Sequence, residues 1–239
     1  MTIRVTTLKS IAAGVAFCLV TIALLWASYG PQDMFRGADR SVHDVESAAA
    51  DLSRWPFGAA EQHFAIDAAS SSRMGFLRRE IRKGFPIPKA WRTELEMART
   101  ESSLALLSTV NVLINKTPYV TEMRDQWKPP VVFLAEGGDC DCFAAAKYIL
   151  LRDLGFSADD LRITGLHLRK NKRLHVVLVA RTGSGKFEKF VLDNIGNYVR
   201  TAIYTDEYVP LISLNENGVW THNRRGQAMA ENFANPAKP

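Results

Sequence analysis

The chain has 239 residues, of which 47% are hydrophobic and 23% are charged, and its formal net charge is +5. This composition is typical of a folded globular protein and excludes a collagen-like or disordered chain. One basic cluster stands in a predicted hairpin tip: Arg169, Lys170, Lys172 and Arg173. Solvated charge is the ordinary explanation for such a tip, so we expect no nucleic-acid partner.

The first 30 residues have the pattern of an export signal peptide or of an uncleaved membrane anchor. Arg4 and Lys9 precede an apolar run from Ile11 to Ala27, and no acidic residue occurs before Asp33. The run is also just long enough for a marginal membrane span, so cleavage and anchoring both stay open. Loss of Arg4 and Lys9 would reduce the net charge from +5 to +3. Either way, we expect the remaining chain outside the cytoplasm.

Residues 31–88 are polar and irregularly patterned, and we expect them to form a helical N-terminal cover. The helical candidates are Val42–Leu52, Ala59–Ala69 and Met74–Lys83. After Pro86 and Pro88, apolar or small residues recur at intervals of three and four from Trp91 to Leu113. This spacing predicts one amphipathic helix with a buried stripe.

A second strong helix is predicted from Cys140 to Leu154. Pro118 and the pair Pro129-Pro130 predict loops on the way to it. Its apolar face contains Phe143, Ala146, Leu150 and Leu154. Gly155 follows as a C-terminal cap, and we expect this helix to be buried.

Three strands rich in branched and aromatic residues follow this helix: Leu161–Leu168, Arg173–Arg181 and Phe187–Asp193. The turns between them suit antiparallel hairpins, and a last strand is predicted at Tyr208–Leu214. A helical half followed by a sheet half indicates the α+β class. We therefore expect one domain at residues 89–226, followed by a loose tail at 227–239.

Cys140 follows a glycine pair and stands at the predicted start of a helix. Unpaired backbone N–H groups and the positive end of the helix dipole stabilise a thiolate there. His175 lies in the second predicted strand and Asp193 ends the third, so neighbouring strands would bring both to the start of this helix. The thiolate would attack a carbonyl, the imidazole would protonate the leaving amine, and the carboxylate would orient the imidazole. We therefore predict a Cys140–His175–Asp193 triad that acts through an acyl-enzyme.

The oxyanion formed in such a reaction needs two donors. The backbone N–H of Cys140 is one, and the side chains of Asn115 and Trp127 are candidates for the other. Each triad residue alone also has a structural explanation: a buried thiol, a core histidine and an aspartate that forms a turn. The joint order along the chain favours the chemical reading.

Cys142 introduces an alternative pattern. Together with Cys140, His175 and an aspartate, it could form a zinc site. Side chains two residues apart on a helix point to different sides, however, which disfavours both this site and a disulfide between the two thiols. We expect Cys142 to be a buried neighbour of the nucleophile or a redox-sensitive bystander.

Further motifs surround these residues between about Val110 and Trp220. They are Val110-Asn111, Asn115, Tyr119, Trp127, Gly138-Asp139-Cys140, Ala146-Lys147-Tyr148, Leu151-Arg152-Asp153-Leu154-Gly155, His175-Val176-Val177-Leu178, Val191-Leu192-Asp193-Asn194 and Asn217-Gly218-Val219-Trp220. With these motifs the chain resembles the bacterial transglutaminase-like cysteine peptidases, whose best-known members are the LapG-type periplasmic proteases that release surface adhesins.

The resemblance implies a papain-like or transglutaminase-like fold, in which a buried nucleophile helix packs on an antiparallel sheet. It places the same triad on Cys140, His175 and Asp193. It also implies a Ca²⁺ site at Asp139 and Asp141, although the family more usually has glutamate at position 141 and an acid at position 142. Carboxylate oxygens suit this cation. The alternative is that Asp139 caps the helix.

By the same resemblance, we expect a periplasmic cysteine endopeptidase whose protein substrate is a surface adhesin and whose regulator is an inner-membrane protein. Two other functions stay open. A transglutaminase-type acyl transferase would use the same triad and differ only in the nucleophile that resolves the acyl-enzyme. A binding module could retain the fold without catalysis.

Overall fold

The computed structural model describes six stretches of the chain: residues 56–57, 61–64, 72–121, 126–183, 188–202 and 205–234. The predicted signal or anchor at residues 1–30 and the helical candidate at 42–52 lie outside these stretches. Among the described helices, none combines the length and the apolar character that a bilayer crossing requires.

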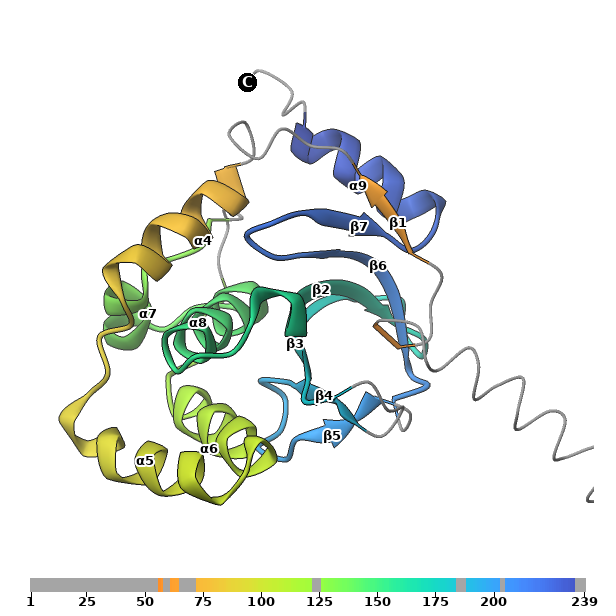
Figure 1. Ribbon diagram of the computed structural model, residues 1–239. Coiled ribbons are helices and arrows are strands. Elements are labelled where there is room, and N and C mark those ends of the chain that lie inside the picture. The colour runs from red at the N-terminus through yellow and green to blue at the C-terminus, as the bar shows by residue number, and fades with distance from the viewer. Residues whose placement is uncertain are drawn as a thin grey trace, which may run out of the picture. The chain divides into compact units, whose positions relative to one another are not determined.

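The described residues form a seven-stranded sheet in which all neighbouring strands are antiparallel (Figure 1). The strand order is β1-β7-β6-β2-β3-β4-β5. The strands are β1 (Gln62–Phe64), β2 (Leu161–Leu168), β3 (Leu174–Arg181), β4 (Lys189–Leu192), β5 (Arg200–Thr201), β6 (Tyr208–Leu214) and β7 (Val219–Thr221). The antiparallel sheet predicted from the turns and the branched residues is confirmed.

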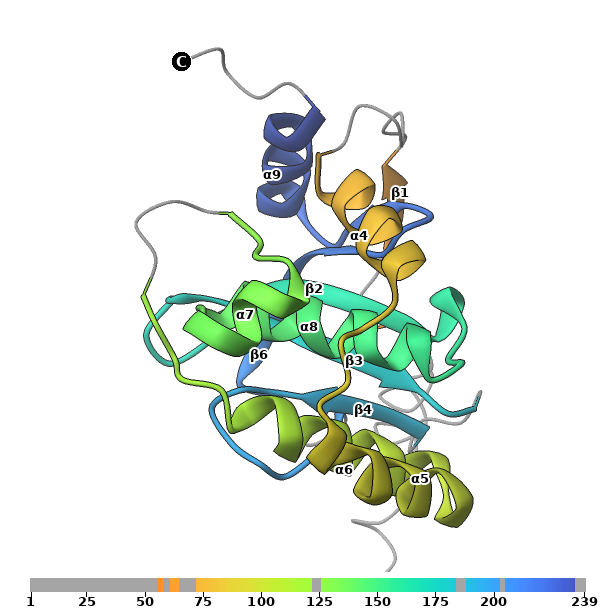
Figure 2. The same cartoon turned by 90° about the vertical axis from the view of Figure 1, so that its left-hand side faces the viewer.

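Helices cover one side of this sheet around a central helix, α8 (Figures 1 and 2). The helices are α4 (Ser72–Lys83), α5 (Arg92–Glu101), α6 (Ser103–Asn115), α7 (Pro130–Glu136), α8 (Cys140–Asp153) and α9 (Arg224–Ala234), with 3₁₀ turns η1 (Lys89–Trp91) and η2 (Ala158–Asp160). Helix α8 packs on β2 and β3, while α4, α6 and α7 contact it from its other sides. Every residue from Asp141 to Leu151 is buried. The α+β class and the buried helix that begins at Cys140 are therefore confirmed.

The single helix expected from Trp91 to Leu113 is wrong, because Ser102 divides it. The backbone of Ser102 is extended, and its hydroxyl oxygen accepts a hydrogen bond from the Ala105 N–H at 3.0 Å. This is an N-cap, so α6 begins anew after it. The apolar spacing continues across the break, which is why periodicity alone missed it.

Two other expectations also differ from the structure. Within the helical candidate Ala59–Ala69, residues 62–64 form β1, which pairs with β7 through His63 and Trp220. In the expected loose tail, α9 extends to Ala234, and Asn223 Oδ1 accepts a hydrogen bond from the Gly226 N–H at 2.9 Å near its start. Helix α9 then packs against β6 and β7. Tertiary contacts overrule local pattern in both places.

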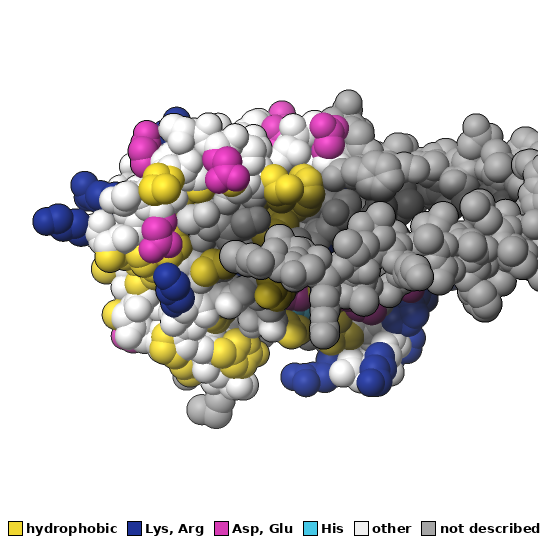
Figure 3. All heavy atoms as spheres, turned by 90° about the horizontal axis from the view of Figure 1, so that it is seen from below, with side chains coloured by type: hydrophobic (Ala, Val, Ile, Leu, Met, Phe, Trp, Pro, Cys, Tyr) yellow, Lys and Arg dark blue, Asp and Glu magenta, His cyan; other side chains and the backbone are white. Residues whose placement is uncertain are grey.

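Apolar side chains are scattered among acids and bases on the face seen in Figure 3. Such a mixture is ordinary for a solvent-exposed surface.

Candidate active site

A glycine pair positions the start of α8 against the segment that follows α6. Gly137 has a φ of +79°, and a Cβ there would lie 2.3 Å from the Pro118 carbonyl oxygen. A Cβ at Gly138 would lie 2.6 Å from Cys142 Cβ. The Val120 N–H donates to the Gly138 carbonyl at 2.9 Å. A side chain at Gly137 would push this segment away from the start of α8, and one at Gly138 would clash with the first turn of α8 itself.

The structure brings the three predicted site residues together. Cys140 is the first residue of α8 and has a partly exposed free thiol. His175 in β3 and Asp193 directly after β4 are buried, and His175 Nε2 lies 2.8 Å from Asp193 Oδ1. His175 also hydrogen-bonds Cys140. Because Nε2 faces the carboxylate, Nδ1 is the ring nitrogen left for the thiol.

Asp193 has two further hydrogen-bond donors. The Tyr208 hydroxyl donates to Oδ2, and the Ile195 N–H donates to Oδ1 at 3.0 Å. Burial raises the pKa of Asp193, but the hydrogen bonds from His175 and Tyr208 outweigh it and hold the pKa at about 2. The carboxylate is therefore ionised and accepts only, which fixes Nε2 of His175 as a donor.

The surroundings favour the protonated form of His175. Burial lowers the pKa of the imidazole, but the hydrogen bonds to Asp193 and Cys140 raise it more strongly, to about 9. An imidazolium is therefore present at neutral pH between a carboxylate and a thiol. This is the arrangement that a thiolate–imidazolium pair requires.

Sequence reasoning missed Tyr208 as a member of this site. Tyr208 is the first residue of β6, and its hydroxyl donates a hydrogen bond to Asp193, which directly follows β4. In the sequence it looks like any aromatic residue of a strand. Its partner depends on strand order, which local pattern does not reveal.

Asn115 holds the loop after β4 in place. Its Nδ2 donates to the backbone carbonyls of Asp193 at 2.9 Å and Gly196 at 3.0 Å. The side chain predicted as a second oxyanion donor is therefore occupied elsewhere. Trp127 Nε1 is buried and has no hydrogen-bond partner among the described residues, so it is the candidate that stays open.

The thiol opens into a cleft with an apolar border. The residues that line it are Tyr119, Cys140, Leu168, Arg173, Leu174, His175, Asn194 and Ile195. Tyr119, Leu174 and Ile195 are large apolar side chains exposed by 54%, 57% and 69%. Exposed apolar side chains beside a reactive group favour the binding of a polypeptide.

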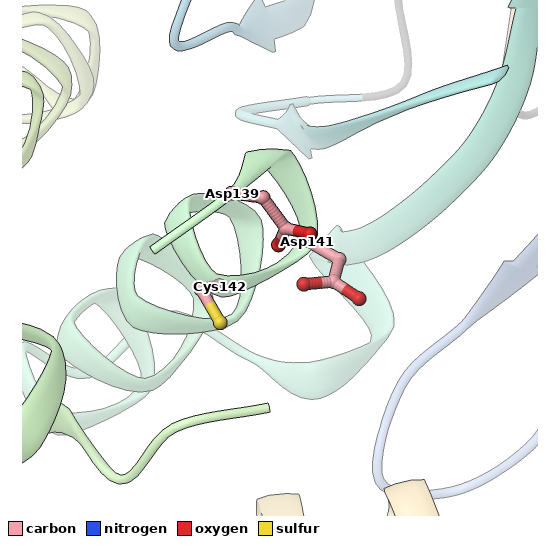
Figure 4. A group of neighbouring side chains, drawn as sticks. All are labelled: Asp139, Asp141 and Cys142. Atoms are coloured by element: carbon pink, nitrogen blue, oxygen red, sulfur yellow. The ribbon is translucent and has the colours of Figure 1, made fainter. Parts of the chain in front are cut away.

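Two carboxylates and a thiol meet at the first turn of α8 (Figure 4). One ligand atom each from Asp139, Asp141 and Cys142 lies within 4.8 Å of the others. Asp139 stands at the N-cap position but makes no capping hydrogen bond, so the cap alternative is wrong. The described residues do not bring Cys140, Cys142 and His175 into one metal group, which leaves the zinc alternative without support.

The two carboxylates at this first turn differ in their contacts. Asp139 Oδ1 is buried and has no hydrogen-bond partner among the described residues. Asp141 Oδ2 lies 3.7 Å from Arg73 Nη1 of α4. A divalent cation would satisfy the first oxygen and would compete with the arginine for the second.

Comparison with known proteins identifies the family of the chain. A model of the family described as bacterial transglutaminase-like cysteine proteinase matches residues 88–227, which is more than half of the chain. No curated protein matches the chain.

Three solved structures of Legionella pneumophila LapG share the fold, each with a TM-score of 0.51. Calcium-bound LapG is 23% identical, over 67% of this chain and 98% of LapG. A second LapG structure is 23% identical over 72% and 99%, and EGTA-treated LapG is 22% identical over 72% and 100%.

Proposed function

Because the chain belongs to the family of bacterial transglutaminase-like cysteine proteinases and is therefore a cysteine peptidase, we propose that it hydrolyses peptide bonds of a protein with Cys140, His175 and Asp193. The observation that carries this assignment is the position of His175. Its Nε2 lies 2.8 Å from Asp193 Oδ1, while the ring also hydrogen-bonds the Cys140 thiol.

The reaction follows from these contacts. The Cys140 thiolate attacks the peptide carbonyl, and the backbone N–H of Cys140 donates to the oxyanion, with Trp127 Nε1 as the candidate second donor. The His175 imidazolium gives its proton to the leaving amine, which leaves a thioester on Cys140. The neutral imidazole then takes a proton from water, and the resulting hydroxide attacks the thioester carbonyl. The carboxylic acid of the cleaved peptide leaves, and the Cys140 thiolate and the His175 imidazolium are regenerated.

Asp193 and Tyr208 act on this reaction through His175. The carboxylate holds the ring by Nε2 and stabilises its positive charge, while the tyrosine hydroxyl holds the carboxylate. Neither group touches the reacting carbonyl in this scheme. Their substitution should therefore alter the pH dependence of the rate as well as its size.

We also propose that Asp139 and Asp141 bind Ca²⁺, a cation that LapG binds in its calcium-bound structure. Their oxygens are hard ligands, and Oδ1 of Asp139, which has no hydrogen-bond partner in the described part of the chain, fits a cation. When bound, the ion would add positive charge beside the start of α8. The soft thiol of Cys142 is a poor ligand for it, and Arg73 already neutralises part of the charge on Asp141. Weak binding is therefore expected.

The N-terminal pattern supports a further proposal about location. Arg4, Lys9 and the apolar run to Ala27 are typical of an export signal or anchor, which would place the peptidase in the periplasm. The family resemblance makes a surface adhesin the first substrate to test and an inner-membrane protein the first regulator to test.

Incubation of the purified protein with a library of fluorescently labelled proteins tests the reaction. We expect fragments from the wild type and from Cys142→Ala, and none from Cys140→Ala or His175→Ala. Incorporation of an added primary amine in place of hydrolysis would identify an acyl transferase. Tight binding with neither reaction would identify a binding module.

A further inference from the structure

A second pocket, of about 180 Å³, lies next to the active-site cleft and shares Leu174 and His175 with it. Its walls include Arg73 of α4, Asp141 of α8 and Met229 of α9. Its floor comes from three neighbouring strands, β6, β2 and β3. The floor residues are Ile163, Gly165, Leu166, Val176, Ile212 and Leu214. The pocket therefore offers an apolar floor beside the group that would protonate the leaving amine.

Gly165 accounts for the hollow in this floor. It pairs with Val176 on β3 and with Ile212 on β6, so the three residues form one cross-strand row. Side chains in such a row stand side by side, and the glycine leaves a gap between two branched neighbours. A Cβ at Gly165 would lie 3.1 Å from Ile212 Cγ2. Even one added carbon would therefore narrow the pocket.

Trp127 adds an aromatic wall to this apolar pocket. Its ring lies under the Arg73 guanidinium at 5.0 Å. An apolar floor with an aromatic wall suits the binding of a large apolar side chain.

We propose that this pocket binds one large apolar side chain, such as leucine or phenylalanine, of the peptide that Cys140 attacks. The assignment rests on the proposed function, because it takes the Cys140–His175 pair as the reacting groups. An apolar cavity of about 150 Å³ is known to hold a benzene molecule, so a pocket of this size suits a ring or a branched chain. The shared Leu174 and His175 let one extended peptide occupy the pocket and the cleft together.

Peptidyl vinyl sulfones that modify a thiolate give a test that does not need the natural substrate. Each probe is an alanine peptide in which one position at a time carries Ala, Leu or Phe. Peptide mapping by mass spectrometry gives the rate of Cys140 modification separately from that of Cys142. At one position, we expect Leu and Phe probes to react at least about tenfold faster than the Ala probe, the range that apolar pockets achieve.

Two variants connect this preference to the pocket. Gly165→Ala should reduce the preference for Leu and Phe at least about threefold, because the new methyl group occupies space beside Ile212. Met229→Ala should widen the wall and raise the Phe rate relative to the Leu rate. Met97→Ala on α5 is the control, because this side chain is 67% exposed and lines neither pocket. If circular dichroism shows that Gly165→Ala is unfolded, the effect of Met229→Ala on the side-chain preference decides the pocket assignment alone.

The outcomes separate this assignment from the proposed proteolysis. Equal rates for all probes, or a preference that neither pocket variant changes, would overturn the pocket assignment while protein cleavage could still stand. A preference that responds to the variants, in a protein that cleaves no protein substrate, would support the pocket and reject proteolysis. A Cys140 that reacts with no probe would overturn both.

Discussion

Helix α8 lies between two buried carboxylates that have similar hydrogen-bond partners but different roles. Asp193 lies near its first turn and Glu216 near its last, and each accepts a hydrogen bond from a tyrosine hydroxyl, from Tyr208 and Tyr148 respectively. Each also meets a cation. His175 Nε2 lies 2.8 Å from Asp193, and Arg152 Nη2 lies 2.8 Å from Glu216.

The cation is where the two networks differ. Arginine stays protonated in proteins, so the Arg152–Glu216 pair is permanent and ties the end of α8 to the turn between β6 and β7. The His175 imidazolium can instead lose its proton, because its pKa is about 9, and its ring also hydrogen-bonds the Cys140 thiol. The comparison teaches that a buried carboxylate with a tyrosine can serve as an anchor or as part of a reactive site, depending on the cation it holds.

The largest expected effect comes from removing each cation. His175→Ala should reduce protein cleavage at least about 10³-fold, because the thiol loses its ion-pair partner and its proton donor. Arg152→Ala should instead lower the free energy of unfolding by about 3 kcal/mol, because Glu216 loses its charge partner inside the protein. Cleavage rates and urea unfolding of both variants check this. If Arg152→Ala folds but loses as much cleavage activity as His175→Ala, the distinction between an anchoring and a reactive network is contradicted.

The next largest effect comes from neutralising each carboxylate without changing its shape. Asp193→Asn should reduce kcat/KM by about 10²–10⁴-fold, because an amide fixes the wrong tautomer of His175 and no longer stabilises its charge. Glu216→Gln should leave kcat/KM within about threefold of the wild type and should lower stability. Tyr208→Phe removes only one hydrogen-bond donor to Asp193, so its kcat/KM should lie between those of Asp193→Asn and Glu216→Gln.

A third prediction concerns pH. The pKa of His175 is raised to about 9, so kcat/KM should fall as pH rises through about 9, where the imidazolium is lost. The charged ring also stabilises the fold fully below about pH 6.5, and this contribution is lost as pH rises through 9. In Asp193→Asn the alkaline limb should move toward lower pH. An unmoved limb in a folded variant would show that Asp193 does not set the charge of His175.

The sequence predicted the reactive network better than the anchor. Cys140, His175 and Asp193 follow one another with a helix start, a strand and a strand end, and an antiparallel hairpin must bring the last two together. Glu216 lies in a turn, where a charged side chain is usually solvated. Its burial depends on Tyr148 and Arg152, which are remote in sequence and carry no local signal.

Other features depended on register and close approach. The pocket beside His175 exists because Gly165 faces Val176 and Ile212, and strand pairing cannot be read to that precision from one sequence. Helix α9 was missed although Asn223 stands at its start, because the composition after Gly226 resembles a loop. Gly226 is needed there, since a Cβ would lie 1.7 Å from the Leu211 carbonyl oxygen.

Calcium binding should respond to charge at the first turn of α8 and not to the anchor at its other end. We expect calorimetry to show weak binding, abolished by Asp139→Ala, and strengthened about tenfold by Cys142→Asp, which adds a hard oxygen ligand. Glu216→Gln is the matched control and should leave binding unchanged. Absence of heat in the wild type and in Cys142→Asp would contradict the proposed calcium site.

The smallest expected effect on catalysis comes from a third cation, the buried Lys147 of α8, which lies between the two networks. It is fully buried, and its Nζ has no hydrogen-bond partner among the described residues. Burial lowers its pKa to about 7, although attraction to Asp193 opposes this shift. Lys147→Met should leave kcat/KM within about twofold and raise the free energy of unfolding by about 1–3 kcal/mol, since an unsatisfied polar group is replaced by an apolar one of similar shape.

The pH dependence of this gain separates Lys147 from both networks. A lysine with a lowered folded pKa destabilises the fold most at and below pH 7, and this penalty fades as pH rises toward its unfolded pKa. The stability difference between Lys147→Met and the wild type should therefore be largest at pH 7 and should shrink toward pH 10. Urea unfolding of both proteins at the two pH values measures it. A constant difference would mean that the ammonium finds compensation inside the protein, which would make Lys147 a second permanent anchor like Arg152.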